Sequence, residues 1–153
     1  MSLGKWISRG LRRARAAGVG GFTAWAVAFA PGAVWAQEEV PLDLLGKWQV
    51  VSIEGTAVTD AATVILEFEE AGTIDGSGGC NTVFGPLRFE GRGILIGPLA
   101  ATRKACEPEI MDQEKNFLKA IGTVRDFRSE EGQQVLVLLN GQGEEIIRLA
   151  ASN

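Results

Sequence analysis

The chain has 153 residues, contains neither histidine nor tyrosine, and carries a formal net charge of −4. The lack of histidine excludes Ser-His-Asp triads, Cys-His pairs and histidine-bound metals. The lack of tyrosine removes a phenolic acid or nucleophile. Carboxylates, lysines and thiols remain as catalytic groups, so the composition disfavours an enzyme but leaves carboxylate chemistry open.

The charge is unevenly distributed along the chain. Five of the fifteen basic residues precede the first acidic residue, Glu38: Lys5, Arg9, Arg12, Arg13 and Arg15. The region from Gln37 onward holds the other ten basic residues and all nineteen acidic ones, which gives it a net charge of −9. Because such a region repels nucleic acids and anionic lipid headgroups, we expect neither as a partner.

Residues 1–36 have the order of regions found in a secretory signal peptide. A basic segment (1–15) precedes a moderately apolar one (18–34), and Val34-Trp35-Ala36 resembles a cleavage site. Glycines and Pro31 interrupt the apolar segment, which is short for a membrane span of about 20 residues. We therefore predict cleavage after Ala36 rather than a retained anchor, followed by a linker over 37–43.

The predicted signal peptide also indicates where the mature protein is located. It ends without a cysteine, so the mature chain has no acceptor for a lipid anchor. Arg12-Arg13 is compatible with twin-arginine export, but bulky apolar residues do not follow it, so general secretion is favoured. We expect a periplasmic protein with no stable membrane anchor, secretion being the alternative.

The pattern of the mature region predicts an antiparallel β protein, because short apolar runs alternate with glycine-rich breaks. Val64, Leu66 and Phe68 alternate with other residues, which predicts a strand with one buried face. The turn signals at 90–93 and 140–143 predict two hairpins, and Asn and Gly in the second tolerate positive φ. Strands are expected over 48–53, 64–69, 73–79, 87–89, 94–96, 135–139 and 146–149.

One segment has helical periodicity. Within 108–121, one face gathers four apolar residues, with Met111 at its margin: Ile110, Phe117, Leu118 and Ile121. Pro108 suits the first turn and Gly122 suits the C-terminal cap. We predict that this helix, the only long one of the mature region, packs its apolar face on the sheet.

Four motifs in order over residues 44–149 resemble the META domain of the HslJ-like heat-shock family. They are Leu45-Gly46-Lys47-Trp48, Gly79-Cys80-Asn81, the segment from Leu99 to Cys106, and Glu114 with Phe117-Leu118. The resemblance implies a META domain over 44–150 with an α+β, mostly β fold: a small antiparallel β-barrel-like or strongly curved sheet with one packed α-helix. The resemblance also implies a location in the bacterial envelope and an association with heat and other stress, rather than a known reaction.

Cys80 and Cys106 both lie in these motifs, and in an exported protein two such cysteines predict one disulfide. The bridge would enclose 25 residues, and loss of chain entropy would stabilise the fold by roughly 3 to 3.5 kcal/mol. The alternatives are two buried free thiols or a redox-active pair, although the latter lacks Cys-x-x-Cys spacing.

The remaining polar motifs point to surface roles or backbone geometry. The stretch 76–79 matches neither a nucleophile turn nor a phosphate loop, so backbone freedom or close strand packing explains its glycines. Alternating carboxylates usually form a solvated strand face, and we expect no metal site or cofactor there. These carboxylates are Glu54, Glu67, Glu69, Glu70 and Asp75.

The candidate partner-contact residues are Asn81, Thr102, Arg103 and Lys104. Thr102-Arg103-Lys104 forms a basic segment on an acidic domain, which favours a contact with a partner. A solvated loop that contacts no partner can have the same residues. Asn81 could orient a ligand or could satisfy backbone groups in a turn.

These observations lead to a functional hypothesis: a non-catalytic exported envelope-stress protein that binds proteins or small apolar compounds and supports heat or drug tolerance. One alternative is an assembly or pilot-type partner of an outer-membrane complex. A carboxylate-dependent hydrolase is the other, and it requires two buried acids that converge in a cleft.

Overall fold

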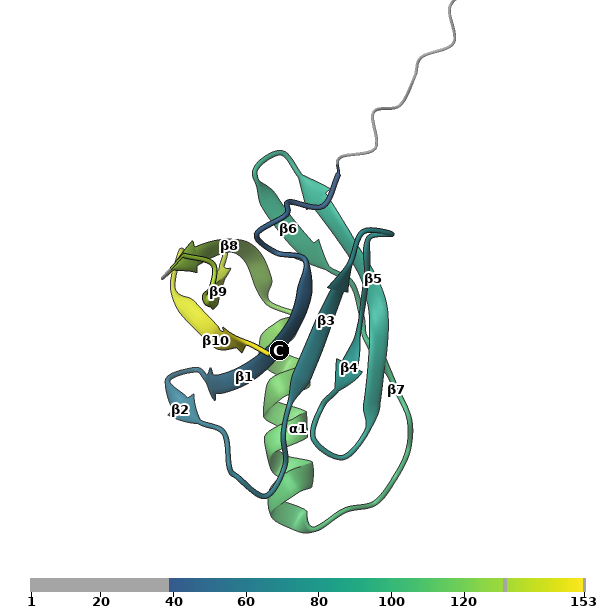
Figure 1. Cartoon of the computed structure of the whole chain (residues 1–153). Helices are drawn as coiled ribbons and strands as arrows, with labels where there is room; N and C mark the ends of the chain where they lie inside the picture. The colour runs from purple at the N-terminus through teal and green to yellow at the C-terminus, as the bar shows by residue number, and fades with distance from the viewer. Residues whose placement is uncertain (1–38, 131, 153) are drawn as a thin grey trace, which may run out of the picture. The chain divides into compact units, whose positions relative to one another are not determined.

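The computed structural model describes residues 39–130 and 132–152. The predicted signal peptide (1–36) and the first two residues of the predicted linker lie outside the described residues. Within them the fold is mostly β with one α-helix, arranged as an antiparallel, nearly closed barrel (Figure 1). The predicted fold class is therefore confirmed.

The strands form one antiparallel sheet in the order β6-β5-β4-β3-β1-β10-β9-β8, with β2 paired to β1 and β7 paired to β5. The helix α1 spans Pro108–Ile121. The strands are β1 (Gly46–Ile53), β2 (Thr56–Ala57), β3 (Ile65–Glu69), β4 (Thr73–Ser77), β5 (Thr82–Glu90), β6 (Gly93–Ile96), β7 (Ala100–Ala101), β8 (Val124–Glu130), β9 (Val135–Asn140) and β10 (Glu145–Ala151).

The sheet curls until its two end strands, β6 and β8, pack against each other. No ladder of backbone hydrogen bonds joins them in the described part of the chain. A Cβ on Gly93 of β6 would lie only 2.6 Å from the carbonyl oxygen of Arg125 on β8. The absence of a side chain at Gly93 therefore permits the close approach that nearly closes the barrel.

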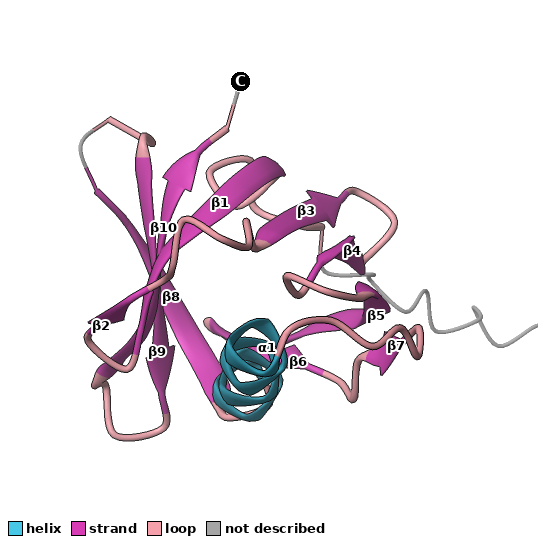
Figure 2. Ribbon diagram, turned by 90° about the horizontal axis from the view of Figure 1, so that it is seen from below, coloured by secondary structure: helices cyan, strands magenta, loops and turns pink. Residues whose placement is uncertain are grey.

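Helix α1 lies between the two halves of the curved sheet, and Figure 2 shows it almost end-on in that position. Phe117, Ala120 and Ile121 are buried together with the inward residues of the strands. The strand expected over 64–69 corresponds to β3, and its predicted buried face is confirmed, because Leu66 and Phe68 are 0% and 2% exposed. The helix thus completes the core that the sheet alone leaves open.

The ends of α1 follow the sequence signals in part. Pro108 occupies the first turn, where its missing N–H needs no partner. Gly122 is the C-cap residue but has a right-handed φ of −68°, so the positive φ that makes glycine favourable there is not used. Thr123 closes the helix instead, since its N–H and its hydroxyl both donate to the Ala120 carbonyl oxygen.

Both predicted hairpins are present. Residues 91 and 92 connect β5 to β6, and Gly91 has φ +64°. In the β9–β10 turn, Gly143 has φ +79°, whereas the Asn140 side chain contributes in another way. Its Oδ1 accepts hydrogen bonds from the backbone N–H groups of Gln142 and Glu144. The asparagine therefore stabilises the turn through its side chain rather than through a left-handed backbone.

Three strands and one packed residue were not expected from the sequence. Strand β8 contains a single fully buried side chain, Val124, and short β2 and β7 are each two residues long. Val40, within the predicted linker, is 9% exposed and belongs to the hydrophobic core. The packed part of the described chain therefore begins before Leu44.

Candidate functional site

The sequence motifs from the middle of the chain meet around the first turns of α1. We call this group the motif cluster: Cys80, Asn81, Thr102, Cys106 and Glu114. Cys80 and Asn81 precede β5, Thr102 and Cys106 follow β7, and Glu114 lies on α1. Three segments that are up to 34 residues apart in sequence are thereby joined by direct contacts.

Glu114 is the centre of the motif cluster. Its side chain is buried, with only 4% of the residue exposed. One carboxylate oxygen accepts the backbone N–H of Cys80 at 3.0 Å and that of Asn81 at 2.6 Å. The other accepts the Asn81 side-chain amide at 2.6 Å. A buried carboxylate needs such donors, and the chain supplies three of them.

Asn81 connects the loop before β5 to the segment that follows β7. Its Oδ1 accepts the Thr102 hydroxyl at 2.8 Å and the Lys104 backbone N–H at 2.7 Å. Both ends of its amide group are thus used inside the protein, and the residue is 4% exposed. Of the two roles considered for Asn81, these hydrogen bonds correspond to the one in which its polar atoms satisfy neighbouring groups of the chain.

A disulfide joins Cys80 and Cys106, with an S–S distance of 2.05 Å and a Cα–Cα distance of 6.0 Å. The predicted pairing is present in the structure. The bridge links the segment before β5 to the residue two positions ahead of α1. It therefore holds the same two segments that Asn81 connects through hydrogen bonds.

The glycines before Cys80 serve packing and backbone geometry. A Cβ on Gly78 would lie 2.9 Å from a carboxylate oxygen of Glu114, and Gly79 has φ +118°. A Cβ on Gly76 would overlap the Ile65 carbonyl of the neighbouring strand. Close packing and backbone freedom therefore account for this glycine-rich stretch.

Gln113, the neighbour of Glu114, attaches α1 to a second loop. Its side-chain amide donates to the Ala62 carbonyl oxygen at 3.0 Å, and its oxygen accepts the Thr59 N–H at 2.7 Å. Two consecutive helical residues thus hold the 59–62 loop and the loop before β5. The sequence interpretation did not identify Gln113, and no motif points to it.

Glu114 gave a signal that the sequence interpretation did not use. It lies four residues after Ile110 and three before Phe117, which places it inside the predicted apolar stripe. A single carboxylate in such a stripe indicates a buried acid with donors from another segment. The helical periodicity by itself predicts only apolar residues on that face.

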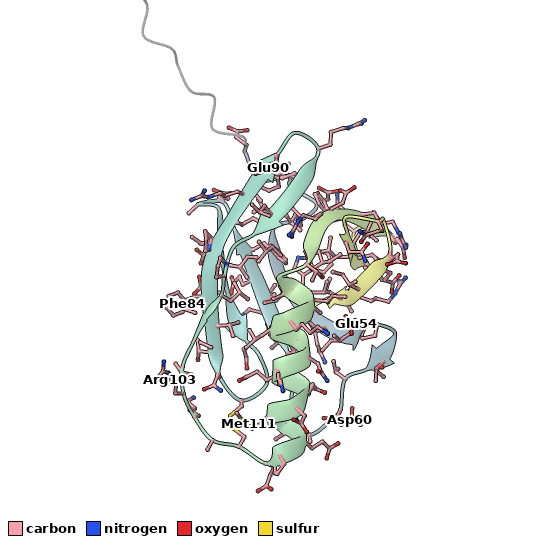
Figure 3. The ribbon with its side chains drawn as sticks, turned by 180° about the vertical axis from the view of Figure 1, so that it is seen from behind. Glu54, Asp60, Phe84, Glu90, Arg103 and Met111 are labelled. Atoms are coloured by element: carbon pink, nitrogen blue, oxygen red, sulfur yellow. A yellow bond between two sulfur atoms is a disulfide. The ribbon has the colours of Figure 1, made fainter. Side chains whose placement is uncertain are left out.

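Thr102, Arg103 and Lys104 form a surface segment, which we call the basic loop. The Thr102 N–H donates to the Thr82 carbonyl oxygen at 3.0 Å, and Lys104 is held by Asn81. Arg103 lies between these two anchored residues and points outward (Figure 3). The basic loop is therefore fixed in the backbone and free in its charged side chains.

The acidic residues considered as a cation site lie apart from the motif cluster. Glu67 forms an ion pair with Lys47 at 3.7 Å, and Glu69 accepts the Thr73 hydroxyl at 2.7 Å. No group of three or more metal-ligating residues is arranged around a common point in the described part of the chain. This arrangement agrees with carboxylates on solvated strand faces.

A separate ion network lies across β8 and β10. Arg128 and Arg148 both contact Glu130, at 2.7 and 3.0 Å, and Arg148 also contacts Glu145 at 2.8 Å. Hydrogen bonds from Arg128 and then Arg148 lower the pKa of Glu130 below its ordinary value. Hydrogen bonds to Glu145 and then to Glu130 raise the pKa of Arg148.

The number of buried acidic side chains can be compared with the two that a carboxylate-dependent hydrolase requires. Within residues 39–130 and 132–152, Glu114 is the only buried charged residue, and both of its oxygens are hydrogen-bonded to the chain. The two converging buried acids that a carboxylate hydrolase requires are not found in this part of the chain. Helices here also lack the length and hydrophobicity needed to cross a bilayer.

The fold and the motif cluster define a class: in the described part of the chain, a small antiparallel barrel with one helix, whose buried carboxylate holds the loop before β5. The sequence model of the META domain matches residues 41–153, and the chain belongs to the META domain family. No curated protein matches the chain.

Two solved structures share the fold. A protein of Burkholderia xenovorans, solved by NMR, is 20% identical with a TM-score of 0.58, over 72% of this chain and 84% of that one. A DUF4847 family protein of Bacteroides vulgatus, solved by crystallography, is 17% identical with a TM-score of 0.52, over 72% of this chain and 95% of that one. At these identities the similarity establishes the fold alone.

Proposed function

We propose that this META domain is a non-catalytic, exported envelope-stress protein of the HslJ-like type that contacts another protein through its basic loop. Family membership supports the domain type, and the sequence resemblance to HslJ-like proteins supports the stress role. The observation that carries the proposal is the fixed backbone on either side of the exposed Arg103.

This fixed backbone favours recognition for an energetic reason. Ordering a flexible loop on binding costs free energy, whereas the basic loop is already ordered by Asn81, Thr82 and the disulfide. A pair of adjacent basic residues on a region of net charge −9 is also electrostatically distinct. An acidic surface on the partner protein complements it.

The disulfide supports export. Disulfides persist in oxidising compartments such as the periplasm and are rare in the cytosol. Cys80 and Cys106 are bonded to each other, and no free cysteine is present. Together with the predicted signal peptide, this bond favours a periplasmic location.

The cavities favour a protein partner over a small apolar compound. Four cavities lined by described residues all have charged side chains at their walls. The cavity between β2 and α1, for example, has a volume of about 370 Å³, and its wall includes Glu54, Glu109 and Asp112 beside the apolar Ile53, Ala57 and Val58. Pockets for apolar ligands are lined mainly by hydrophobic and aromatic side chains.

Affinity capture tests the proposed contact. The protein is expressed from its full-length gene, purified from the envelope fraction, immobilised, and exposed to envelope extracts. We expect a saturable, salt-sensitive partner that is lost with the R103E/K104E variant. R88E/R92E is the charge-matched control, because Arg88 and Arg92 are also exposed, and it should retain the partner. Equal capture by both variants would show that the basic loop is not the contact.

A genetic experiment tests the stress role. Deletion of the gene should sensitise cells to heat or to envelope-active compounds. Complementation with the natural gene or with R88E/R92E should restore survival, whereas R103E/K104E should fail at equal protein abundance. Unchanged survival of the deletion strain under these stresses would contradict the envelope-stress function. Capture of a single outer-membrane complex would instead indicate an assembly factor.

A further inference from the structure

The cavity between β2 and α1 gathers acidic side chains from two elements. Glu54 follows β1 directly, whereas Glu109 and Asp112 lie three residues apart on one face of α1. Neither lysine nor arginine is among the described residues that line this cavity. No basic group of the described residues lies within 4.0 Å of the three carboxylates either. The described part of the chain therefore leaves the acids of this cavity unpaired.

These carboxylates do not surround a common point. Nowhere in residues 39–130 and 132–152 do three or more acidic or cysteine side chains form a group that could hold a metal ion. Hard metal ions are bound by several oxygen ligands at once. Glu54 and the two acids of α1 belong to different walls of the cavity. A cation that complements all three must therefore be extended, with its positive charges separated from one another.

Apolar side chains line the cavity beside its acids. Ile53 is only 6% exposed, and Val58 packs against the hydrophobic core. The methylene groups of a long cationic chain can cover such residues while its charged groups reach the acids. The volume of about 370 Å³ falls in the size range of small-molecule sites, roughly 300 to 1,000 Å³. The cavity thus combines separated acids with an apolar surface.

Thr59 provides a second, independent indication of a ligand. Its hydroxyl oxygen is one of two buried side-chain oxygens among the described residues that have no hydrogen-bond partner. Thr59 lies in the wall of the cavity, where the Gln113 side chain accepts its backbone N–H at 2.7 Å. Because buried polar groups are normally hydrogen-bonded, an N–H donor from a bound molecule would satisfy this oxygen. The hydrogen bond from Thr59 to Gln113 also orders this wall in advance, which lowers the cost of binding.

We propose that this cavity binds a linear aliphatic polyamine. Its ammonium groups pair with Glu54 on one wall and with Glu109 and Asp112 on the other. One of its N–H groups donates to the Thr59 hydroxyl oxygen, and its methylene segments cover the apolar residues. The net charge of −9 from Gln37 onward attracts such a polycation to the domain.

This site is separate from the basic loop, so the proposal goes beyond the contact with another protein. Figure 3 shows Glu54 and Arg103 on opposite sides of α1. The polyamine is positively charged, whereas the partner surface expected at the basic loop is acidic. Variants can therefore remove each of the two sites without the other.

The exposure of the three acids sets the expected strength of binding. Ion pairs between exposed groups are individually weak and are screened by salt. We expect a dissociation constant on the order of 0.1 mM at low ionic strength, and weaker binding as salt is added.

An NMR titration tests the site, with spermidine as the probe. Isotope-labelled protein expressed from the full-length gene is titrated with spermidine at constant ionic strength. We expect saturable shifts of the backbone amide signals of Val58, Thr59, Gln113 and Asn116, which line the cavity. A neutral aliphatic diol of similar length should cause no such shifts, because it lacks the charges. Mg²⁺ should not cause them either, because its charge is concentrated at one point.

Three variants locate the contact, after circular dichroism has established that each is folded. E109Q/D112N should weaken spermidine binding roughly tenfold, because it removes the ion pairs with α1. E70Q/D75N is the charge-matched control, since both residues are exposed and lie outside the cavity, and it should bind like the natural protein. T59V should weaken binding several-fold without lowering the thermal midpoint, because the free protein loses an unpaired hydroxyl rather than a hydrogen bond.

Two results would overturn the proposal. Equal affinities of E109Q/D112N and E70Q/D75N, with shifts spread over all acidic surfaces, would show that spermidine is only a counterion of the domain. Binding of a lysine-rich peptide at the cavity without binding of spermidine would assign the cavity to a basic segment of another protein. R103E/K104E should bind spermidine like the natural protein, so either result leaves the role of the basic loop unaffected.

Discussion

At the scale of single residues, Glu114 explains why distant motifs converge. It is a buried acid on an otherwise apolar helix face, and an unpaired buried carboxylate would be strongly unfavourable. The Cys80 and Asn81 backbone N–H groups remove that cost, and Asn81 extends the contact to Thr102 and Lys104. The surface position of Arg103 is therefore determined from within the core.

Replacing Glu114 with glutamine should destabilise the protein although the shape is preserved. Glutamine has one acceptor and one donor group, so one of its ends must face an N–H group that Glu114 accepts. An unsatisfied buried donor costs about 1 to 3 kcal/mol, and Glu114→Ala should cost more. Urea denaturation measures the change.

Glu109→Gln is the matched control, because this glutamate is exposed on the same helix and should change stability by less than about 0.5 kcal/mol. If Glu114→Gln is as stable as this control, the carboxylate does not hold the loop before β5.

Glu130 should contribute to stability in a pH-dependent way. Its pKa is lowered from 4.5, chiefly by hydrogen bonds from Arg128 and Arg148. A carboxyl group with a lowered folded-state pKa stabilises the protein above its unfolded pKa, and this contribution is lost as pH falls through the folded pKa. Glu130→Gln should therefore lower the thermal midpoint at pH 7, and the difference from the natural protein should vanish in acid.

Thermal scans from pH 7 to about pH 3 measure this effect, with Glu90→Gln as the control because Glu90 is exposed and has no basic partner within 4.0 Å among the described residues. A difference that stays constant with pH would contradict the assignment. Added salt should reduce it at pH 7, since the network is at the surface.

Residue identity alone predicted the motif cluster incompletely. The two cysteines were paired correctly because a chain that is predicted to be exported and has only two cysteines can form one internal bridge. Asn81 was ambiguous, since an asparagine in a turn satisfies either a ligand or the backbone, and the deciding partner is 33 residues away. Contacts between distant segments leave no mark in local sequence patterns.

At the scale of elements, the clearest predictions were those with a local cause. The β5–β6 and β9–β10 hairpins follow from turn residues, and α1 follows from its periodicity and Pro108. Strand β8 was missed because only Val124 is fully buried and charged residues occupy most of its outer face. Its pairing with β9, rather than its own composition, makes it a strand.

The disulfide should stabilise the attachment of α1 without being required for the sheet. Its two cysteines are 26 positions apart, and the chain-entropy estimate for such a loop is about 3.5 kcal/mol. We expect reduction, or the double variant C80S/C106S, to lower the thermal midpoint while the far-ultraviolet β signature persists. The inward faces of the strands remain packed in either case.

Differential scanning calorimetry with and without reductant measures this change, and the double serine variant should be insensitive to the reductant. Equal midpoints for oxidised and reduced protein would show that the hydrogen bonds among Glu114, Cys80, Asn81, Thr102 and Lys104 hold these segments without the disulfide.

At the scale of the whole molecule, the barrel depends on contacts that differ in kind around its circumference. Hydrogen-bonded ladders run from β6 through β1 to β8, but the gap between β6 and β8 is closed by packing. Helix α1 fills the space between the two halves (Figure 2). The family resemblance predicted a curved sheet, and helical periodicity predicted the packed helix. Gly93 was predicted only as part of the turn at 90–93, and no local pattern indicates its role in the close approach of β6 and β8.

Gly93→Ala should weaken this closure. The new Cβ would lie 2.6 Å from the Arg125 carbonyl oxygen, a backbone atom that cannot move without shifting β8. Forcing packed segments apart costs about 1 to 3 kcal/mol. Gly141→Ala is the matched control, because its Cβ would meet only the Arg125 Cγ at 3.7 Å and its φ is not left-handed. Hydrogen exchange should show faster exchange confined to β6 and β8 in Gly93→Ala. Unchanged exchange there, with the same stability as Gly141→Ala, would mean that β6 and β8 separate without cost and that the ladders alone determine the barrel.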